Sequence, residues 1–177
     1  MNKKNKAKAK CYENYPFWII LVSNFVSIAI YLFGGYIIYQ LGFIWLLIYI
    51  LYIVWLEIRL LKGSCVNCYY YGKYCAFGKG KLSCLFFKKG DPKKFIHMQI
   101  TWKEIIPDFL VSIIPLLAGI VLLIRNFSWI LLGVMVLLFV FMAVGNAFVR
   151  GTVACKYCKQ RELGCPAEKL FSKNKTN

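Results

Sequence analysis

The sequence is short of negative charge and of histidine. Its 177 residues include 23 Lys or Arg but only 7 Asp or Glu, and the single histidine is His97. One histidine excludes a haem held by two histidines and the two-histidine H-E-x-x-H zinc motif. The chain also lacks a Walker phosphate-binding loop and the G-x-S-x-G nucleophile motif, so the sequence does not indicate an enzyme.

Apolar residues are abundant, at 60% hydrophobic and 18% aromatic content, which is more than an ordinary soluble domain carries. The net charge of +16 would usually suggest a nucleic acid or an anionic surface. Here the basic residues flank apolar segments, as membrane topology requires, and no nucleic-acid-binding module is present. We therefore expect the lipid bilayer, and no nucleic acid, as a partner.

Four apolar segments are long enough to cross a bilayer. The first has 23 residues, which at 1.5 Å per residue is about 34 Å. It is too long for a signal peptide, and Tyr39-Gln40-Leu41 offers no small-residue cleavage site. We expect an all-α membrane protein, a bundle of four transmembrane helices. The expected spans are residues 17–39, 43–61, 105–124 and 129–149.

The distribution of charge predicts the orientation of these helices. In the four-helix arrangement only Arg125 falls on the outer side, whereas the other 22 basic residues and all 7 acidic ones fall inside. The positive-inside rule then places both termini in the cytoplasm of a cell-membrane protein.

A cysteine pattern occurs twice in the polar segments. Cys65, Cys68 and Cys75 form a C-x2-C-x6-C hook, and a second hook follows with each cysteine offset by 90 residues: Cys155, Cys158 and Cys165. Each copy comes after two predicted spans. The chain therefore has an internal repeat of two tandem helical hairpins, each followed by a cytoplasmic hook. Because each half has two crossings, we expect parallel repeats about an axis along the membrane normal.

The repeat divides the chain at residue 90. The first repeat, residues 1–90, has a basic tail, two spans and a cysteine segment over 65–84. The second, residues 91–177, opens with Asp91-Pro92, a capping residue followed by the residue favoured at the first helical position. Apolar residues at helical spacing then predict an amphipathic helix over 92–104 in the membrane interface. Two spans, the hook over 155–165 and a polar tail follow.

Metal binding is the leading interpretation of the cysteines. A C-x2-C pair lets two thiolates reach one ion across a tight turn; zinc takes four such ligands, and iron–sulfur clusters also use cysteine thiolates. Disulfides are disfavoured, because the cytosol is reducing. Nearby basic residues would offset the negative charge of a thiolate site. They are Lys73, Lys79, Lys81, Lys156, Lys159 and Arg161.

Three arrangements of ligands are open. In the first, Cys84 completes a four-cysteine site with the first hook, and the second hook takes an additional ligand such as Cys11. We expect this arrangement, with two neighbouring sites. In the second, the hooks face each other across a pseudo-twofold axis and share metals. In the third, the hooks hold iron–sulfur clusters, and the sequence does not decide between zinc and iron–sulfur.

The cysteine spacing resembles two known patterns. C-x2-C-x6-C repeated twice is similar to the six-cysteine, two-zinc cluster of fungal transcription factors. The likeness covers the spacing alone, since two membrane helices replace the usual short linker, and DNA binding does not carry over. Cys165-Pro166 is similar to the Cys-Pro ending of bacterial ferredoxin motifs, but the full ferredoxin run is absent.

Polar residues are expected in the inner part of the spans, where they either bond between helices or form a polar vestibule beneath the thiols. They are Ser23, Asn24, Ser27, Glu57, Asp108, Ser112 and Asn146. Several glycines would allow helices to approach closely. These are Gly34, Gly35, Gly119, Gly133 and Gly145.

The favoured function is a structural, sensor or adaptor protein with a cytoplasmic metal–thiolate site and a cytoplasmic protein partner. One alternative is a membrane electron-transfer subunit with iron–sulfur clusters. Another is a membrane thiol–disulfide oxidoreductase, which resembles the four-helix disulfide-generating enzymes in helix count only. Those enzymes work on the oxidising face, whereas the predicted topology places these thiols on the opposite side.

Overall fold

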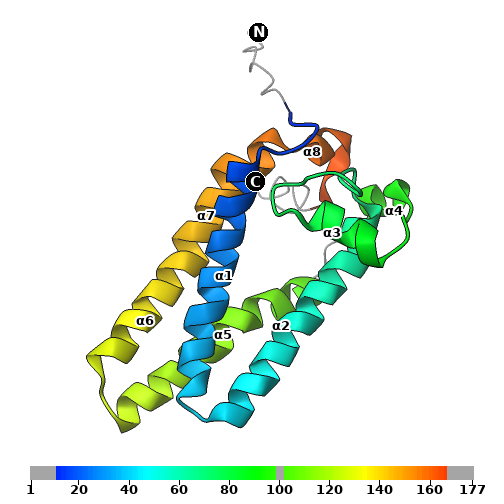
Figure 1. Cartoon of the computed structure of the whole chain (residues 1–177). Coiled ribbons are helices and arrows are strands. Elements are labelled where there is room, and N and C mark those ends of the chain that lie inside the picture. Colours follow the sequence, from blue (N-terminus) through cyan, green and yellow to red (C-terminus); the bar gives the residue numbers. More distant parts are fainter. Residues whose placement is uncertain (1–10, 99–101, 167–177) are drawn as a thin grey trace, which may run out of the picture.

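The computed structural model describes residues 11–98 and 102–166 (Figure 1). Within this part of the chain, four helices are long and apolar enough to cross a membrane, as predicted. The first three are α1 (Phe17–Tyr39), α2 (Phe43–Gly63) and α5 (Trp102–Arg125). The fourth starts with α6 (Trp129–Val140). The described residues contain no β-strand, and one isolated bridge pairs Tyr12 with Cys158. The all-α membrane fold is therefore as expected.

The fourth membrane helix is longer than predicted. It was expected to end at residue 149, but it continues from α6 through a π-helical turn, η2 (Phe141–Gly145), the short α7 (Asn146–Phe148) and a second π-helical turn, η3 (Val149–Ala154). Side chains bond back to the helix here, from Asn146 Nδ2 to Met142 O at 3.2 Å and from Thr152 Oγ1 to Phe148 O at 2.6 Å. Such bonds compete with the regular α pattern. The extension carries the chain directly to Cys155.

Helix α1 packs against α2, α5 and α6. Its buried face repeats at helical spacing and includes Ile19, Val26, Ile30 and Ile37. The outer surface of the bundle exposes large apolar side chains, such as Leu51, Leu117 and Phe139, each more than half exposed. This inversion of the soluble pattern suits a bundle whose outer surface meets lipid tails.

A tyrosine replaces the backbone hydrogen bond that Pro115 removes from α5. In a regular helix the carbonyl of Val111 would accept from the N–H of residue 115, which proline lacks. The hydroxyl of Tyr49 on α2 donates to Val111 O instead, at 2.9 Å. Gly34 on α1 makes room for that ring, because a Cβ there would lie 3.1 Å from Tyr49 Cζ and 3.2 Å from Pro115 Cγ. Three helices thus meet at one satisfied carbonyl.

Replacing Tyr49 with phenylalanine is expected to destabilise the bundle by about 1–3 kcal/mol, since a buried carbonyl would lose its partner where no water can replace it. Thermal unfolding in detergent measures this loss. Tyr36→Phe is the matched control, because Tyr36 is 40% exposed on the surface of α1, and it should leave stability unchanged. Equal effects of the two substitutions would show that the Tyr49 hydroxyl is not a stabilising partner of Val111.

The helices of the polar segments gather at one end of the bundle, where α1 begins (Figure 1). They are η1 (Cys65–Asn67), α3 (Lys79–Phe86), α4 (Pro92–His97), η4 (Cys155–Tyr157) and α8 (Lys159–Gly164). We call residues 11–16, 64–98 and 155–166 together the cysteine cap. Helix α3 was not predicted.

The helix expected over 92–104 differs from the structure. Asp91 caps α4 as predicted, its side chain accepting from Lys93 N, but α4 ends at His97 and Met98 is extended. Residues 99–101 lie outside the described part of the chain, and Trp102 already belongs to α5. The apolar residues at helical spacing over 92–104, which predicted one helix, therefore belong to parts of two helices, α4 and α5.

Candidate functional site

The two C-x2-C pairs adopt the same backbone turn. Each first cysteine begins a 3-10 helix, and its carbonyl accepts from the N–H of the second cysteine, at 3.3 Å between Cys68 N and Cys65 O and at 3.4 Å between Cys158 N and Cys155 O. The carbonyl of the second cysteine then accepts from the N–H of the residue three positions later, at 3.0 Å from Tyr71 N to Cys68 O and at 3.1 Å from Arg161 N to Cys158 O. The sequence repeat is therefore a repeat of local structure at these turns.

The hooks reach their third cysteine by different routes. In the first hook the chain turns through Gly72, whose φ of +76° is in the left-handed region, and Cys75 Sγ accepts from Gly80 N at 3.4 Å. In the second hook α8 fills the same six-residue interval, and Gly164 at φ +114° ends it just before Cys165. Glycine supplies the positive φ in both cases.

The two hooks are joined by a reciprocal pair of hydrogen bonds. Tyr69 N, the first amide after Cys68, donates to Gln160 Oε1 at 2.7 Å. Lys159 N, the first amide after Cys158, donates to the hydroxyl of Tyr70 at 2.9 Å. Tyr70 and Gln160 each lie two positions after the second cysteine of their own hook. The side chain at this position in each hook accepts a hydrogen bond from a backbone amide of the other hook. The exchange is therefore reciprocal, since equivalent positions of the two hooks act as acceptors for each other.

Tyr70 and Gln160 were missed from the sequence, although they carry this junction. Both are buried, with 2% and 4% exposure. The available signal was their shared position in the C-x2-C-x6-C repeat, where a tyrosine and a glutamine differ too much to be noticed as equivalents.

The segment that precedes α1 binds both hooks. Tyr12 N donates to Tyr157 O at 3.0 Å, and Tyr15 N donates to Tyr74 O at 2.9 Å. The Tyr70 hydroxyl that accepts from the second hook also donates to Tyr12 O, at 2.7 Å. The rings of Tyr12, Tyr15 and Tyr70 pack against one another in sequence, with centroids 5.4 and 5.5 Å apart. Residues 11–16 therefore form a strap across the cysteine cap.

All six hook thiols belong to one electrostatic network. Cys65 interacts with Cys75 and Cys68, and Cys68 with Cys75 and Cys165. Cys158 interacts with Cys68 and Cys155. The thiol of Cys68 therefore interacts electrostatically with thiols of both hooks.

The pKa of Cys68 and the pKa of Cys158 are both raised to about 11, chiefly because burial disfavours the thiolate. Hydrogen bonds from backbone amides oppose this effect, from Tyr70 to Cys68 and from Arg161 to Cys158. Amides aimed at sulfur stabilise the anionic form. Each of these two sulfurs therefore accepts from two backbone amides, which partly offsets the effect of burial.

Cys84 and Cys11 lie outside the two hooks. Cys84 lies on α3 and is exposed, as Cys155 of the second hook also is, and its thiol lies against the Tyr71 hydroxyl. Cys11 lies on the strap, where its thiol donates to Cys158 O at 3.8 Å and bonds to Glu162. Burial, followed by the Glu162 carboxylate, raises the pKa of Cys11. Cys11 therefore borders the second hook. The single histidine, His97, is exposed at the end of α4.

Within residues 11–98 and 102–166, no three His, Cys, Asp or Glu side chains converge closely enough to hold an ion, and no cysteine pair forms a disulfide. The donor set nevertheless suits a soft or borderline ion, because thiolates bind zinc and iron–sulfur clusters. For a metal to bind, thiols of the hooks would have to lie closer together than they do in this structure.

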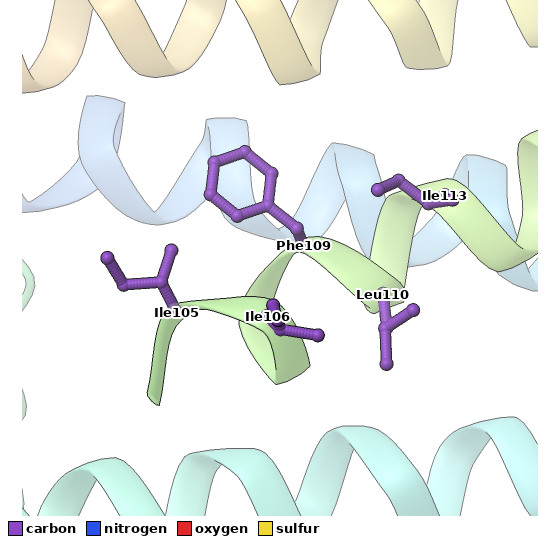
Figure 2. A pocket seen from close by; sticks show the side chains of 5 residues that line it. All are labelled: Ile105, Ile106, Phe109, Leu110 and Ile113. Atoms are coloured by element: carbon purple, nitrogen blue, oxygen red, sulfur yellow. The ribbon is translucent and has the colours of Figure 1, made fainter. Parts of the chain in front are cut away.

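Two hollows differ in chemical character. One, of about 260 Å³, is lined by residues of both hooks, Cys68 and Gln160 among them. The other, of about 290 Å³, lies on α5 and is lined by apolar side chains only, as Figure 2 shows. These are Ile105, Ile106, Phe109, Leu110 and Ile113. The second hollow suits lipid tails and offers no reactive or ligating group.

Some of the polar residues expected beneath the thiols meet across helices. Glu57 on α2 accepts from the Tyr31 hydroxyl of α1 at 2.8 Å, and Asn24 Nδ2 donates to Phe77 O in the cap at 3.3 Å. Ser27 and Asn146 instead bond to carbonyls of their own helices. Ser23 Oγ is fully buried and has no hydrogen-bond partner within the described residues.

Comparison of the chain with protein-family models, with curated proteins and with solved structures finds no match.

Proposed function

We propose that this chain is an integral membrane protein whose hook cysteines bind metal in one shared thiolate site on the cytoplasmic face. The reciprocal hydrogen bonds of Tyr70 and Gln160, which hold the two C-x2-C turns together, carry this proposal. They favour the shared arrangement over two separate sites, because they hold the backbone after Cys68 against the second hook and the backbone after Cys158 against the first.

The rest of the proposed architecture follows from the repeat. Two tandem helical hairpins each end in a hook, and the positive-inside rule places hooks and termini in the cytoplasm. There, in a reducing compartment, the cysteines remain thiols available to a metal. A hollow lined in part by Cys68 and Gln160 lies where the two hooks meet.

The proposed role is that of a sensor or adaptor. The strap and both hooks share the same hydrogen bonds, so loss of metal from the hooks would loosen the strap and change the surface offered to a cytoplasmic protein partner. Thiol–disulfide exchange is less well supported. An attacking cysteine needs a lowered pKa, whereas burial raises the pKa of Cys68 and of Cys158 to about 11.

Anaerobic purification of the full chain, followed by metal analysis and a visible spectrum, tests the proposal. We expect stoichiometric metal in the protein. Zinc without visible absorption supports the sensor or adaptor role, and iron with sulfide and broad visible absorption supports the electron-transfer alternative. A protein that takes up neither, and whose thiols titrate as a redox pair, would contradict metal binding and support the oxidoreductase.

A further inference from the structure

Helix α3 begins beside the membrane helices and not beyond their ends. Its first residue, Lys79, pairs with Glu57 of α2 at 2.7 Å, six positions before α2 ends. The carbonyl of Phe77 accepts from Asn24 Nδ2 at 3.3 Å, and Asn24 lies seven positions inside α1. At 1.5 Å per residue, both contacts lie about 10 Å from the ends of these helices. Helix α3, which packs against α2, is therefore level with the inner parts of the spans (Figure 1).

One face of α3 is apolar and uncovered. Leu82, Leu85 and Phe86 follow the helical spacing i, i+3, i+4, and their exposed fractions are 42%, 75% and 71%. We call these three residues the apolar stripe. Gly80 and Ser83, which lie on the other side of the helix, are buried. The large apolar side chains of α4 are half-buried by contrast. Because α3 packs against α2, the stripe extends the apolar outer surface of the bundle into the cysteine cap.

Basic residues accompany the apolar stripe. Lys81 lies on α3, Lys88 and Lys89 follow its end, and all three are exposed. We call them the stripe lysines. The sequence has no Asp or Glu between Glu57 and Asp91. The ion pairs formed among residues 11–98 and 102–166 do not include the stripe lysines. Their charges therefore complement an anionic surface outside the protein.

We infer that α3 docks on the bilayer as an amphipathic helix, with the apolar stripe among the acyl chains and the stripe lysines on headgroups of anionic phospholipids. Such a helix buries its apolar face about 5–10 Å into the boundary between headgroups and acyl chains, which fits the level of α3 beside the spans. The second residue of α3, Gly80, donates to Cys75 Sγ at 3.4 Å, so the docked helix also contacts the first hook. Docking requires no metal, and the inference goes beyond the proposed function.

Hydrogen–deuterium exchange of the full-length protein in nanodiscs tests this inference. Discs of phosphatidylcholine alone are compared with discs of an equimolar mixture of phosphatidylcholine and phosphatidylglycerol. The amides of residues 82–87 are expected to exchange roughly ten-fold more slowly in the anionic discs, because docking orders a helix too short to be stable by itself. High salt should remove most of this difference, since salt screens the attraction between lysines and headgroups.

The stripe lysines account for the dependence on anionic lipid. K88Q/K89Q is expected to lose most of the roughly ten-fold difference between the two kinds of disc, because each lysine near an anionic leaflet contributes to binding. K93Q/K94Q is the matched control. It removes the same charge from two exposed lysines of α4, which lacks an exposed apolar stripe, and it should keep the difference. If K93Q/K94Q loses as much as K88Q/K89Q, the effect is one of net charge and the inference is wrong.

The apolar stripe accounts for docking itself. L85S/F86S is expected to speed exchange in both kinds of disc, and it should leave the cap folded because both side chains are more than two-thirds exposed. L163S replaces an exposed apolar residue of α8 and should change nothing in α3.

Two results would overturn the inference. One is equal exchange of residues 82–87 in the two kinds of disc. The other is protection that follows the number of protein copies per disc and not the lipid, which would show that a second copy covers the stripe. Metal analysis of the same samples tests the proposed function separately, so either idea can fail while the other stands.

Discussion

Serine at position 68 is expected to remove most of the metal from both hooks at once. The thiol of Cys68 interacts with Cys75 of its own hook and with Cys158 and Cys165 of the other. If the hooks share one site, the substitution removes a ligand from the metal site that cysteines of both hooks form. Because metal binding in small thiolate sites contributes directly to folding, the cysteine cap should also unfold at a lower temperature. Metal content per chain and thermal unfolding measure the two effects.

Cys84→Ser is the informative control for this prediction. Cys84 lies on α3 outside the hooks and its thiol lies beside Tyr71, so the shared site should keep its full metal content without it. The arrangement expected from the sequence makes the opposite prediction, since there Cys84 is the fourth ligand of the first site. A Cys84→Ser protein that loses half its metal, together with a Cys158→Ser protein that keeps the first hook loaded, would establish separate sites.

Alanine at position 80 is expected to collapse the first hook. A Cβ there would lie 2.7 Å from the carbonyl oxygen of Lys73 and closer still to that of Tyr70. Both obstacles are backbone atoms, which cannot rotate away as a side chain can. Gly80 also donates to Cys75 Sγ at 3.4 Å and accepts from Gly72 N at 3.0 Å, so a shift here moves a sulfur of the proposed site. We expect a loss of about 3 kcal/mol or more in the stability of the cap, and most of its metal.

Gly63→Ala provides the matched comparison. Gly63 lies in the last turn of α2, and no atom lies within 4 Å of a Cβ placed there. Alanine is favoured over glycine in a helix by up to about 1 kcal/mol, so this variant should be as stable as the original or slightly more so. Thermal unfolding and metal analysis of the two variants, side by side, decide the matter. Unchanged values for Gly80→Ala would mean that the turn around Tyr70 does not hold the hook.

The placement of Lys79 changes how the basic residues of the cap should be understood. The sequence suggested that lysines near the hooks offset the charge of a thiolate site as a group. The structure distinguishes among them: Lys79 is half-buried and pairs with Glu57 at 2.7 Å, whereas Lys73 pairs with the exposed Glu13 at 3.1 Å and Lys81 contacts Tyr74. Water screens a half-buried charge less than an exposed one, so these three lysines are not equivalent.

The sequence by itself determined the membrane helices and the repeated turns. A run of apolar residues longer than the bilayer core is thick must form a helix there, because every backbone group has to bond within its own segment. The first span was predicted at the bounds observed for α1, Phe17–Tyr39. The C-x2-C turns are equally local, since their defining hydrogen bonds join residues three positions apart.

The tertiary structure decided which distant residues meet. The bonds from Tyr69 to Gln160 and from Lys159 to Tyr70 join residues 91 and 89 positions apart. The partner that Tyr49 finds at Val111 is 62 positions away. Tyrosine and glutamine are common polar residues with no spacing that marks them, and their partners are defined only when α1, α2 and the two hooks pack together. The choice between a shared and a divided cysteine site depends on those long-range contacts, which is why the sequence left it open.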